Sequence, residues 1–306
     1  MKRGGMAISY KVNSSNCIFK FSKNNPCAIS VSSGSIVEFE TLDCYANQFK
    51  SEKDSLESID WQRVNPATGP VFVEGAEPGD VLKVTVEKIR VANRGIMAAC
   101  EGEGTLGHLY KGKHARLFPI KGDKFIFDTE LSIPLKPMIG VIGVTPLEEI
   151  NTLIPGEHGG NMDNTMISED AVVYFPVFVK GALFALGDVH AVMGDGEVGV
   201  SGLEVNAKVR VKLEVDKKKK LNNPLIENNE YFATVASAKT IDDAVIRTTE
   251  DMAALIRRKA NFKIIDLVML MSAVGCAQIC QVVVPLKTAR FLMPKWVLNK
   301  YGIFSF

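Results

Sequence analysis

Residues 203 to 215, LEVNAKVRVKLEV, alternate strictly between apolar and polar side chains. Every second residue from Leu203 to Val215 is apolar, and every residue between them is polar. Successive side chains of a β-strand point to opposite faces of a sheet. This period of two therefore predicts a strand with one buried face and one face in water.

Further strands are predicted across most of the first 215 residues. VLKVTVEKIRV at 81 to 91 follows the turn signal EPGD, and ISVSSGSIVEFETLD at 29 to 43 forms two strands around Ser-Gly. Similar short stretches are separated by Gly, Pro, Asn and Asp. Many strands at this spacing favour an antiparallel sandwich or barrel over a doubly wound sheet.

The pattern changes after DKKKKLNNPLIENNE, a charged connection at 216 to 230. Residues 240 to 259 begin with a Thr cap, end with basic residues and place apolar side chains near helical spacing. A second helix at 264 to 273 and a strand at 278 to 287 complete a strand, helix, helix, strand unit. We therefore expect a mainly β, α+β fold. A β-sandwich-like domain at 1–215 carries the candidate site, and a C-terminal α/β element at 216–306 packs on the same unit.

The composition is that of an ordinary soluble globular protein, 46% hydrophobic and 23% charged. The 36 basic and 35 acidic side chains nearly cancel, so no overall field attracts nucleic acid or a membrane surface. We expect a small neutral partner instead.

Three features predict a cytoplasmic protein. The N-terminal MKRGGMAISYKV lacks the apolar segment of a signal peptide. The apolar stretch 264–284 is interrupted by Asp266, Gln278 and Gln281, which predicts a buried helix followed by a strand instead of a membrane span. The six cysteines lack Cys-x-x-Cys spacing, which is typical of reduced, mostly packed thiols.

Candidate chemistry is concentrated in GALFALGDVHAVMGDGEVGVSGLEV, residues 181 to 205. Asp188 and His190 are two residues apart, which places both side chains on one face of a strand. MGDGEV is a turn, so the chain reverses and returns through the strand that ends at 215. Glu197 lies at that reversal, and Glu204 is predicted on the polar face of the returning strand.

A second stretch, HGGNMDN at 158 to 164, adds an imidazole and a carboxylate on a glycine-rich loop. His158 and Asp163 together with Asp188 and His190 would offer a mixed ligand set suited to zinc-like ions. Such a set leaves a coordination position open for water or substrate.

Structural explanations of the same residues stay open at this point. A histidine beside Gly-Gly is often a hydrogen-bonded loop residue, and an aspartate at a glycine-rich turn often bonds the backbone. Glu204 fits equally well as a solvated residue of an alternating strand. His108 and His114 lack a comparable setting, and we expect them at the surface.

These two stretches resemble the acetamidase/formamidase family. The family's His-Gly-Gly-Asn-Met-Asp motif occurs unbroken at 158–163, and its Gly-Asp-x-His followed by Gly-Asp-Gly-Glu occurs at 187–190 and 194–197. Supporting similarity covers FETLDCYANQ at 39–48, NPATGPVFVEGAEPGDVL at 65–82, IGVIGVTP at 139–146 and QVVVPLKTARFLMPK at 281–295. These blocks follow the family order over nearly the whole chain.

The resemblance implies a largely β-sandwich hydrolase that releases ammonia from small linear amides such as formamide or acetamide. It also implies a divalent metal, with zinc as our first choice, and a homo-oligomer. The chain departs from the family pattern after HGGNMD, in VGVSGLE and in SAVGCAQICQ. These departures flank the candidate ligands, so they bear on substrate choice more than on the chemistry.

The expected mechanism is attack of a metal-activated water on the amide carbonyl. A carboxylate must also collect a proton and pass it to the departing nitrogen. Glu204 is our first choice for this role and Glu197 the second. Asp43 is a further candidate ligand. An aspartate at the end of a strand is also common without any functional role, and this alternative stays open.

Two rival enzyme mechanisms are disfavoured by the sequence, and one rival of another class stays open. Thiol catalysis by Cys100, Cys276 or Cys280 lacks the flanking Glu, Lys or His pattern of such enzymes. A serine mechanism lacks a Gly-x-Ser-x-Gly elbow. A non-catalytic β-sandwich that binds a small ligand or a structural metal would explain the strands and glycines equally well.

Overall fold

The two longest strands of the chain pair with each other along most of their length. They are β7 (Val81–Val91) and β18 (Ala207–Asp216), and they run antiparallel from Ala207 opposite Val91 to Asp216 opposite Val81. β7 has the bounds predicted from its sequence pattern. The computed structural model describes residues 9–51 and 53–306, so most of the MKRGGMAISYKV stretch used for the signal-peptide prediction lies outside the described residues.

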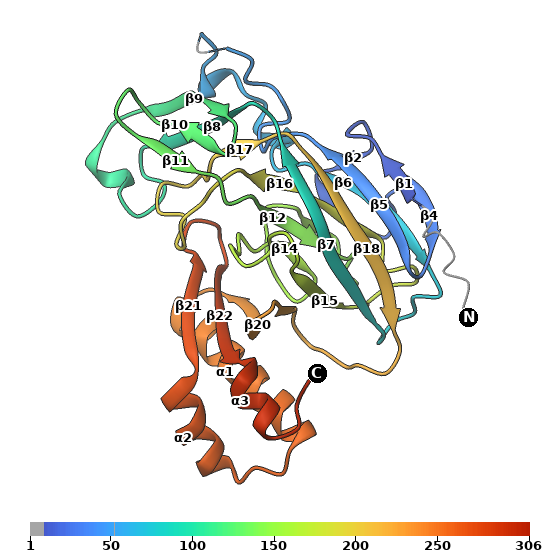
Figure 1. The fold of residues 1–306 in the computed structure, drawn as a ribbon. Helices are drawn as coiled ribbons and strands as arrows, with labels where there is room; N and C mark the ends of the chain where they lie inside the picture. The colour runs from blue at the N-terminus through green and yellow to red at the C-terminus, as the bar shows by residue number, and fades with distance from the viewer. Residues whose placement is uncertain (1–8, 52) are drawn as a thin grey trace.

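β7 and β18 lie in the middle of a large sheet (Figure 1). Within the described residues it has nine strands in the order β1-β5-β18-β7-β15-β19-β20-β22-β21. The remaining bounds are β1 (Ser9–Val12), β5 (Ser35–Thr41), β15 (Val172–Pro176), β19 (Leu225–Glu227), β20 (Tyr231–Ala238), β21 (Cys276–Gln281) and β22 (Lys287–Pro294).

A second sheet packs against the first, and within the described ranges it has eleven strands. Eight of them follow the order β11-β10-β9-β8-β17-β16-β12-β14, and β6 joins β16 to β2 and β4. Their bounds are β2 (Cys17–Ile18), β4 (Ile29–Ser32), β6 (Ala67–Glu74), β8 (Arg94–Cys100), β9 (Lys113–Lys121), β10 (Lys124–Ile126), β11 (Ser132–Pro134), β12 (Met138–Gly143), β14 (Gly159–Asn161), β16 (Phe184–His190) and β17 (Glu204–Val205). Two short strands, β3 (Lys20–Phe21) and β13 (Ile150–Asn151), pair separately.

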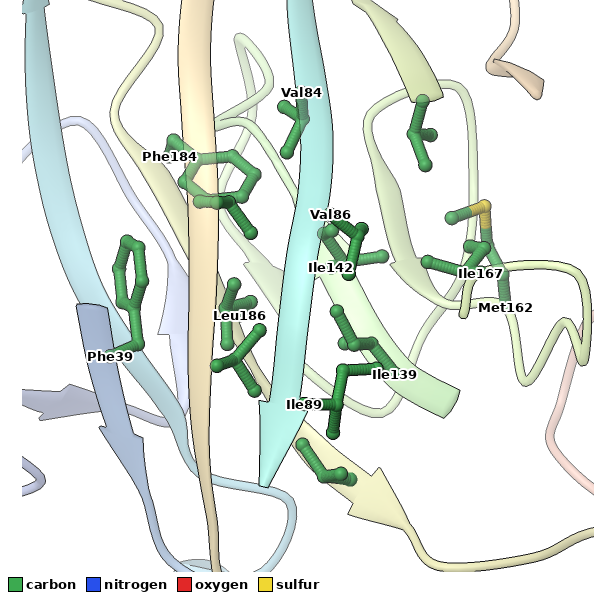
Figure 2. Packing of buried hydrophobic residues seen from close by; sticks show 14 of the residues in the cluster. Phe39, Val84, Val86, Ile89, Ile139, Ile142, Met162, Ile167, Phe184 and Leu186 are labelled. Atoms are coloured by element: carbon green, nitrogen blue, oxygen red, sulfur yellow. The ribbon is translucent and has the colours of Figure 1, made fainter. Parts of the chain in front are cut away.

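The main core fills the space between the two sheets (Figure 2). Val84 and Val86 of β7 pack in one cluster with Ile139 and Ile142 of β12. All four side chains are fully buried, and burial of each branched aliphatic side chain contributes about 1.5–3 kcal/mol. This packing confirms the mainly β, sandwich-like α+β fold.

The stretch 203–215 alternates between buried and more exposed side chains only from Ala207 onward, and it does not form one strand. β17 ends at Val205 and belongs to the second sheet, whereas β18 begins at Ala207 and belongs to the first. The chain therefore crosses between the sheets at Asn206. As a result, Glu204 is buried at 3% exposure, and the prediction that it lies on a solvated face is wrong.

The C-terminal helices gather at the end of the molecule formed by β20, β21 and β22 (Figure 1). They are α1 (Ile241–Lys259), α2 (Ile264–Val274) and α3 (Lys295–Lys300). The Thr240 side chain caps α1 by accepting a hydrogen bond from the Asp243 N–H, as the sequence predicts. The prediction of a buried helix at 264–273 is wrong in its burial, because four apolar side chains of α2 are more than half exposed: Ile264, Ile265, Val268 and Met269.

The strand predicted at 278–287 is replaced by the end of β21, a turn and the start of β22. The buried Gln281 side chain causes this turn. Its Oε1 accepts hydrogen bonds from the N–H groups of Val283 (2.9 Å) and Val284 (3.1 Å), and its Nε2 donates to the Leu286 carbonyl (2.7 Å). Local bonds of this kind compete with strand pairing.

The nine-stranded sheet continues across residue 216, because β15 pairs with both β7 and β19, and β19 pairs with β20. A second core cluster joins Val81 and Tyr174 to Phe232, Met252 and Phe291. None of the helices in the described ranges has the length and apolar character needed to cross a membrane.

Candidate functional site

Five buried polar side chains meet at the end of β16. Asp188 and His190 come from β16, Glu204 from β17, Asp163 from the loop after β14, and Glu197 from the loop between β16 and β17. His190 Nε2 lies 3.0 Å from Glu204 Oε1 and 3.7 Å from Asp188 Oδ1. One side-chain atom from each of Asp163, His190 and Glu197 lies within 4.8 Å of the other two. We call these five residues the acid–histidine cluster.

Strand register explains how distant parts of the chain reach this cluster. His190 pairs with Glu204 across β16 and β17. Asp188 lies opposite Gly140 of β12, between the pairs that flank it. A methyl carbon on Gly140 would lie 2.5 Å from Asp163 Oδ1 and 2.7 Å from Asp188 Oδ2, so only glycine leaves room for both carboxylates.

Three members of the cluster have a left-handed backbone. The φ angles are 43° at Asp163, 52° at Asp188 and 46° at Glu197. This conformation costs about 1–3 kcal/mol for a residue other than glycine and persists where the surrounding structure enforces it. Strain at three acidic residues in one cluster points to a function other than folding stability.

The cluster contains polar atoms that are buried without a hydrogen-bond partner among the described residues. They are both carboxylate oxygens of Asp163, Asp188 Oδ1, His190 Nδ1, Glu197 Oε2 and Glu204 Oε2. Buried polar atoms are nearly always paired, and an unpaired one costs about 1–3 kcal/mol. A ligand that offers several partners at once would therefore be strongly favoured here.

Burial also shifts the pKa values of the cluster. It raises the pKa of Glu204 to about 8 and that of Glu197 to about 7, and it raises the pKa of Asp163 well above the ordinary range. Burial alone would lower the pKa of His190, but the carboxylates of Glu204 and Asp188 outweigh this effect and raise it well above its usual value. The cluster thus concentrates negative charge that favours binding of a proton or another cation.

Neighbouring side chains hold the cluster in place. Asn65 Nδ2 donates a hydrogen bond of 3.1 Å to Asp188 Oδ2. The Arg290 guanidinium, from β22, is 4% exposed and donates to four acceptors: Asn164 Oδ1 (2.8 Å), Thr165 Oγ1 (3.0 Å), Asp195 Oδ2 (2.5 Å) and Gln278 Oε1 (2.7 Å). It therefore ties the loop after Asp163 to the loop before Glu197.

His158 lies apart from the cluster. Its carbonyl accepts a hydrogen bond from the Val144 N–H, four residues along from Gly140, which corresponds to about 13 Å of strand. Its ring packs edge-on against Phe21 with 5.1 Å between centroids, and burial lowers its pKa to about 4. The structure thus gives His158 surroundings different from those of Asp163, Asp188 and His190, with which the sequence analysis grouped it.

Asp43 also lies outside the cluster. Its Oδ1 accepts hydrogen bonds from the N–H groups of Tyr45 (3.0 Å) and Asn47 (2.8 Å), which is the turn arrangement typical of a strand-end aspartate. It lines a separate cavity together with Glu204. His108 and His114 are exposed, as predicted.

Cys44 is a site residue that the sequence analysis missed. One side-chain atom from each of Cys44, Asp188 and Glu204 lies within 4.8 Å of the other two. The only available signal was its position next to Asp43 in FETLDCYANQ. Burial raises the pKa of Cys44 well above that of a free thiol, and the nearby Glu204 raises it further. A protonated thiol is a poor nucleophile.

The three cysteines considered for thiol catalysis are no better placed. Burial raises the pKa of Cys280 to about 12 and also raises that of Cys100. Cys276 is exposed on β21. The geometry thus favours acid–base or metal chemistry over a thiolate.

A cavity of about 380 Å³ opens above the cluster. Its polar floor contains Asn65, Asp188, Glu197 and Glu204, and its other walls are mostly apolar. The cavity gives a small molecule access to the buried carboxylates.

The chain is similar to proteins of one family. The model of the Acetamidase/Formamidase family matches residues 9–153 and 147–238. The crystal structure of a predicted acetamidase/formamidase from Thermoanaerobacter tengcongensis is 53% identical, covers 98% of this chain and 100% of that chain, and has a TM-score of 0.96. The crystal structure of an acetamidase from Bacillus halodurans is 43% identical, covers 96% of this chain and 100% of that chain, and has a TM-score of 0.94.

Curated relatives are more distant. A putative formamidase of Schizosaccharomyces pombe is 27% identical over 62% of this chain and 62% of its own length. The match with this chain therefore spans less than two thirds of that relative.

Proposed function

This chain belongs to the acetamidase/formamidase family, and from that premise we propose that it hydrolyses linear amides to a carboxylate and ammonia. The family match bears out the resemblance found in the sequence. Relatives named acetamidase and formamidase support the proposed reaction. The observation that carries the proposal is the acid–histidine cluster, which holds unpaired buried oxygens and an unpaired ring nitrogen and whose Asp188, Glu197 and Glu204 line a cavity.

A divalent cation fits this cluster. Asp163, His190 and Glu197 would hold it, because their converging atoms are buried and unpaired, and because imidazole nitrogen and carboxylate oxygen are both ligands that zinc binds. The same set also accepts manganese, iron or nickel. When bound there, the cation would polarise the substrate carbonyl and lower the pKa of water, to about 7 in favourable zinc sites.

Glu204 is the proposed proton carrier. It collects the proton of the attacking water and passes it to the amide nitrogen as the carbon–nitrogen bond breaks. Its carboxyl lines the cavity, and a cation bound beside it would lower its pKa from the raised value of about 8 in the metal-free protein toward neutral pH, where it can both accept and donate a proton. Asp188, oriented by Asn65, lies 3.7 Å from His190 Nε2 and adds to the negative charge around the ring.

Ammonia release from formamide and acetamide tests the reaction. We expect activity to disappear after chelation and to return when zinc or manganese is restored. His190→Ala should lower bound metal and turnover together. Glu204→Gln should retain the metal but lower kcat by about 10²–10⁴-fold, the usual contribution of a general acid–base. His158→Ala should retain the metal, because His158 lies outside the cluster.

Two results would oppose the proposal. If folded protein with restored metal releases no ammonia from either amide, the enzyme assignment fails. If His190→Ala keeps full metal content while His158→Ala loses it, the ligand assignment fails.

The homo-oligomer is a separate part of the proposal. The exposed apolar side chains of α2 lie in the helix that immediately precedes β21, the edge strand of the nine-stranded sheet. The outer edge of β21 pairs with Gly196 only at its C-terminal end, so its first residues and the apolar helix are suited to pairing with the same elements of a second copy.

A further inference from the structure

The cavity above the acid–histidine cluster has chemically distinct sides. Its polar floor comes from β16 and β17 of the second sheet and from the loops that carry Asn65 and Glu197, whereas its apolar wall comes from segments outside the strands. The apolar wall includes Trp61, Val64, Leu153, Val200, Val283 and Val284, and the polar side chains of Glu103, Lys113 and Asn161 line the remainder with Cys44, Tyr45 and Cys100. Small-molecule sites typically combine a few converging polar groups with a larger apolar surface in this way.

The cavity is much larger than formamide or acetamide requires. A cavity of about 150 Å³ holds benzene in a protein interior. The volume here is about 380 Å³, which leaves room for an aromatic ring or a short alkyl chain beside the amide group. The apolar wall would bury such a group, whereas formamide has no carbon chain to place against it.

The part of the wall formed by Val283 and Val284 is rigidly held. Gln281 is fully buried, and its side chain bonds both valine N–H groups and the hydroxyl of Thr288. Gly196, next to Glu197, also bridges to Gln281. This wall is therefore fixed relative to the cluster and does not depend on substrate to form it.

The outer part of the wall carries a large aromatic side chain. Trp61 is 45% exposed, and the Lys113 ammonium lies 4.8 Å from the centre of its ring. The contact orients the indole at the side of the cavity, where it offers a flat apolar surface.

We propose that this cavity is an acyl-binding pocket that selects primary amides with a bulky apolar acyl group, of hexanoyl or benzoyl size, over formamide and acetamide. The inference rests on the proposed amide hydrolysis and adds the substrate class. The carboxamide lies on the polar floor by the cluster, and the acyl group lies against Val284, Leu153 and Trp61.

A series of amides tests the proposal on the metal-restored protein. Ammonia release from formamide, acetamide, butanamide, hexanamide and benzamide gives kcat/KM for each. Each buried methylene should raise kcat/KM by about fourfold, so hexanamide, with four more methylenes than acetamide, should exceed it by about 250-fold when all four are buried. Val284→Phe should reduce the hexanamide-to-acetamide ratio by about tenfold, and Val284→Ala should move the preference to longer chains. Ile246→Phe also replaces a branched aliphatic side chain by phenylalanine, but at an exposed site on α1, and it should leave the hexanamide-to-acetamide ratio unchanged.

Binding to Glu204→Gln separates this inference from the reaction itself. Calorimetry should show hexanamide binding more tightly than acetamide, and Val284→Phe in the same background should remove the difference. If no amide is hydrolysed but this binding difference holds, the pocket stands and the proposed reaction falls. If kcat/KM and binding are flat or decline beyond acetamide, the pocket assignment is overturned.

Discussion

At the scale of single residues, four carboxyl groups buried around one imidazole make the metal-free protein sensitive to pH. Glu204 and Glu197 have folded pKa values of about 8 and 7, both above their ordinary value of 4.5. The folded chain therefore holds more protons than the unfolded chain between pH 4.5 and 8. The contribution of these groups to stability is complete below pH 4.5 and is lost as pH rises to 8.

We predict that the free energy of unfolding of chelator-treated protein falls between pH 6.5 and 8. His158, whose pKa is lowered to about 4, has the opposite effect only below pH 6.5. Urea denaturation at several pH values measures the fall. Saturating zinc should reduce it, because metal binding replaces protons in the cluster.

Variants distinguish the source of this effect. Glu204→Gln should make the decline shallower, whereas Glu57→Gln, at an exposed position, should leave it as in the wild type. A free energy of unfolding that rises with pH over this range would contradict the prediction.

The residues of the cluster were predictable to different degrees. Asp163, Asp188, His190, Glu197 and Glu204 could all be named from two motifs, because glycine-rich turns beside acid and imidazole groups are visible in the sequence. The grouping of ligands was less visible. It depends on strand register, which places Gly140 of β12 opposite Asp188. The same register places His158 opposite Val144, just beyond the end of β12.

At the scale of elements, β22 positions the loops of the cluster through one side chain. Arg290 donates to acceptors in both the 163–165 loop and the 195–197 loop. A lysine keeps the charge but cannot reproduce a planar donor fork with this many contacts.

We predict that Arg290→Lys lowers metal affinity by about 10–100-fold, the usual effect of losing a group that orients ligands. At saturating metal, kcat should recover more than it does in Arg290→Gln, which also loses the charge opposite Asp195. Metal titration followed by steady-state kinetics gives both values. Arg210→Lys, in an exposed pair with Glu87, is the matched control.

Unchanged metal affinity in both Arg290 variants would show that the two loops hold their geometry without β22. A rise in KM alone, with normal metal binding and normal kcat, would also contradict the positioning role.

Elements with a clear period were predicted well. β7 and α1 match their expected bounds to within a residue, because alternation and capping are local properties. The division of 203–215 into β17 and β18 was not predictable, since both pieces keep the same alternation while they join different sheets. The turn after β21 was also missed, because it depends on the Gln281 side chain.

At the scale of the whole molecule, the exposed apolar face of α2 bears on assembly. Ile265 is 56% exposed and Met269 is 61% exposed, on the helix that leads into the edge strand β21. Large exposed apolar side chains that lie together are typical of an interaction surface.

We predict that the protein in solution is an oligomer, with a mass at least twice the 33.4 kDa of one chain. Ile265→Glu combined with Met269→Glu should reduce it to that of a single chain, because a buried charge opposes association. Light scattering after size-exclusion chromatography measures the mass.

Leu131→Glu, at an exposed position far along the chain in the β10–β11 turn, should not change the mass. A wild-type protein that is a single chain at micromolar concentration would contradict the prediction.

The course of the nine-stranded sheet has a consequence for how the protein is made. Asp163, Asp188 and Glu204 leave the ribosome well before β22, yet Arg290 of β22 is needed to tie two loops of the cluster together. A nascent chain that has not reached this strand therefore carries an unfinished centre. Ion capture should then follow synthesis of β22, and a ribosome-stalled chain that lacks it should take up little metal.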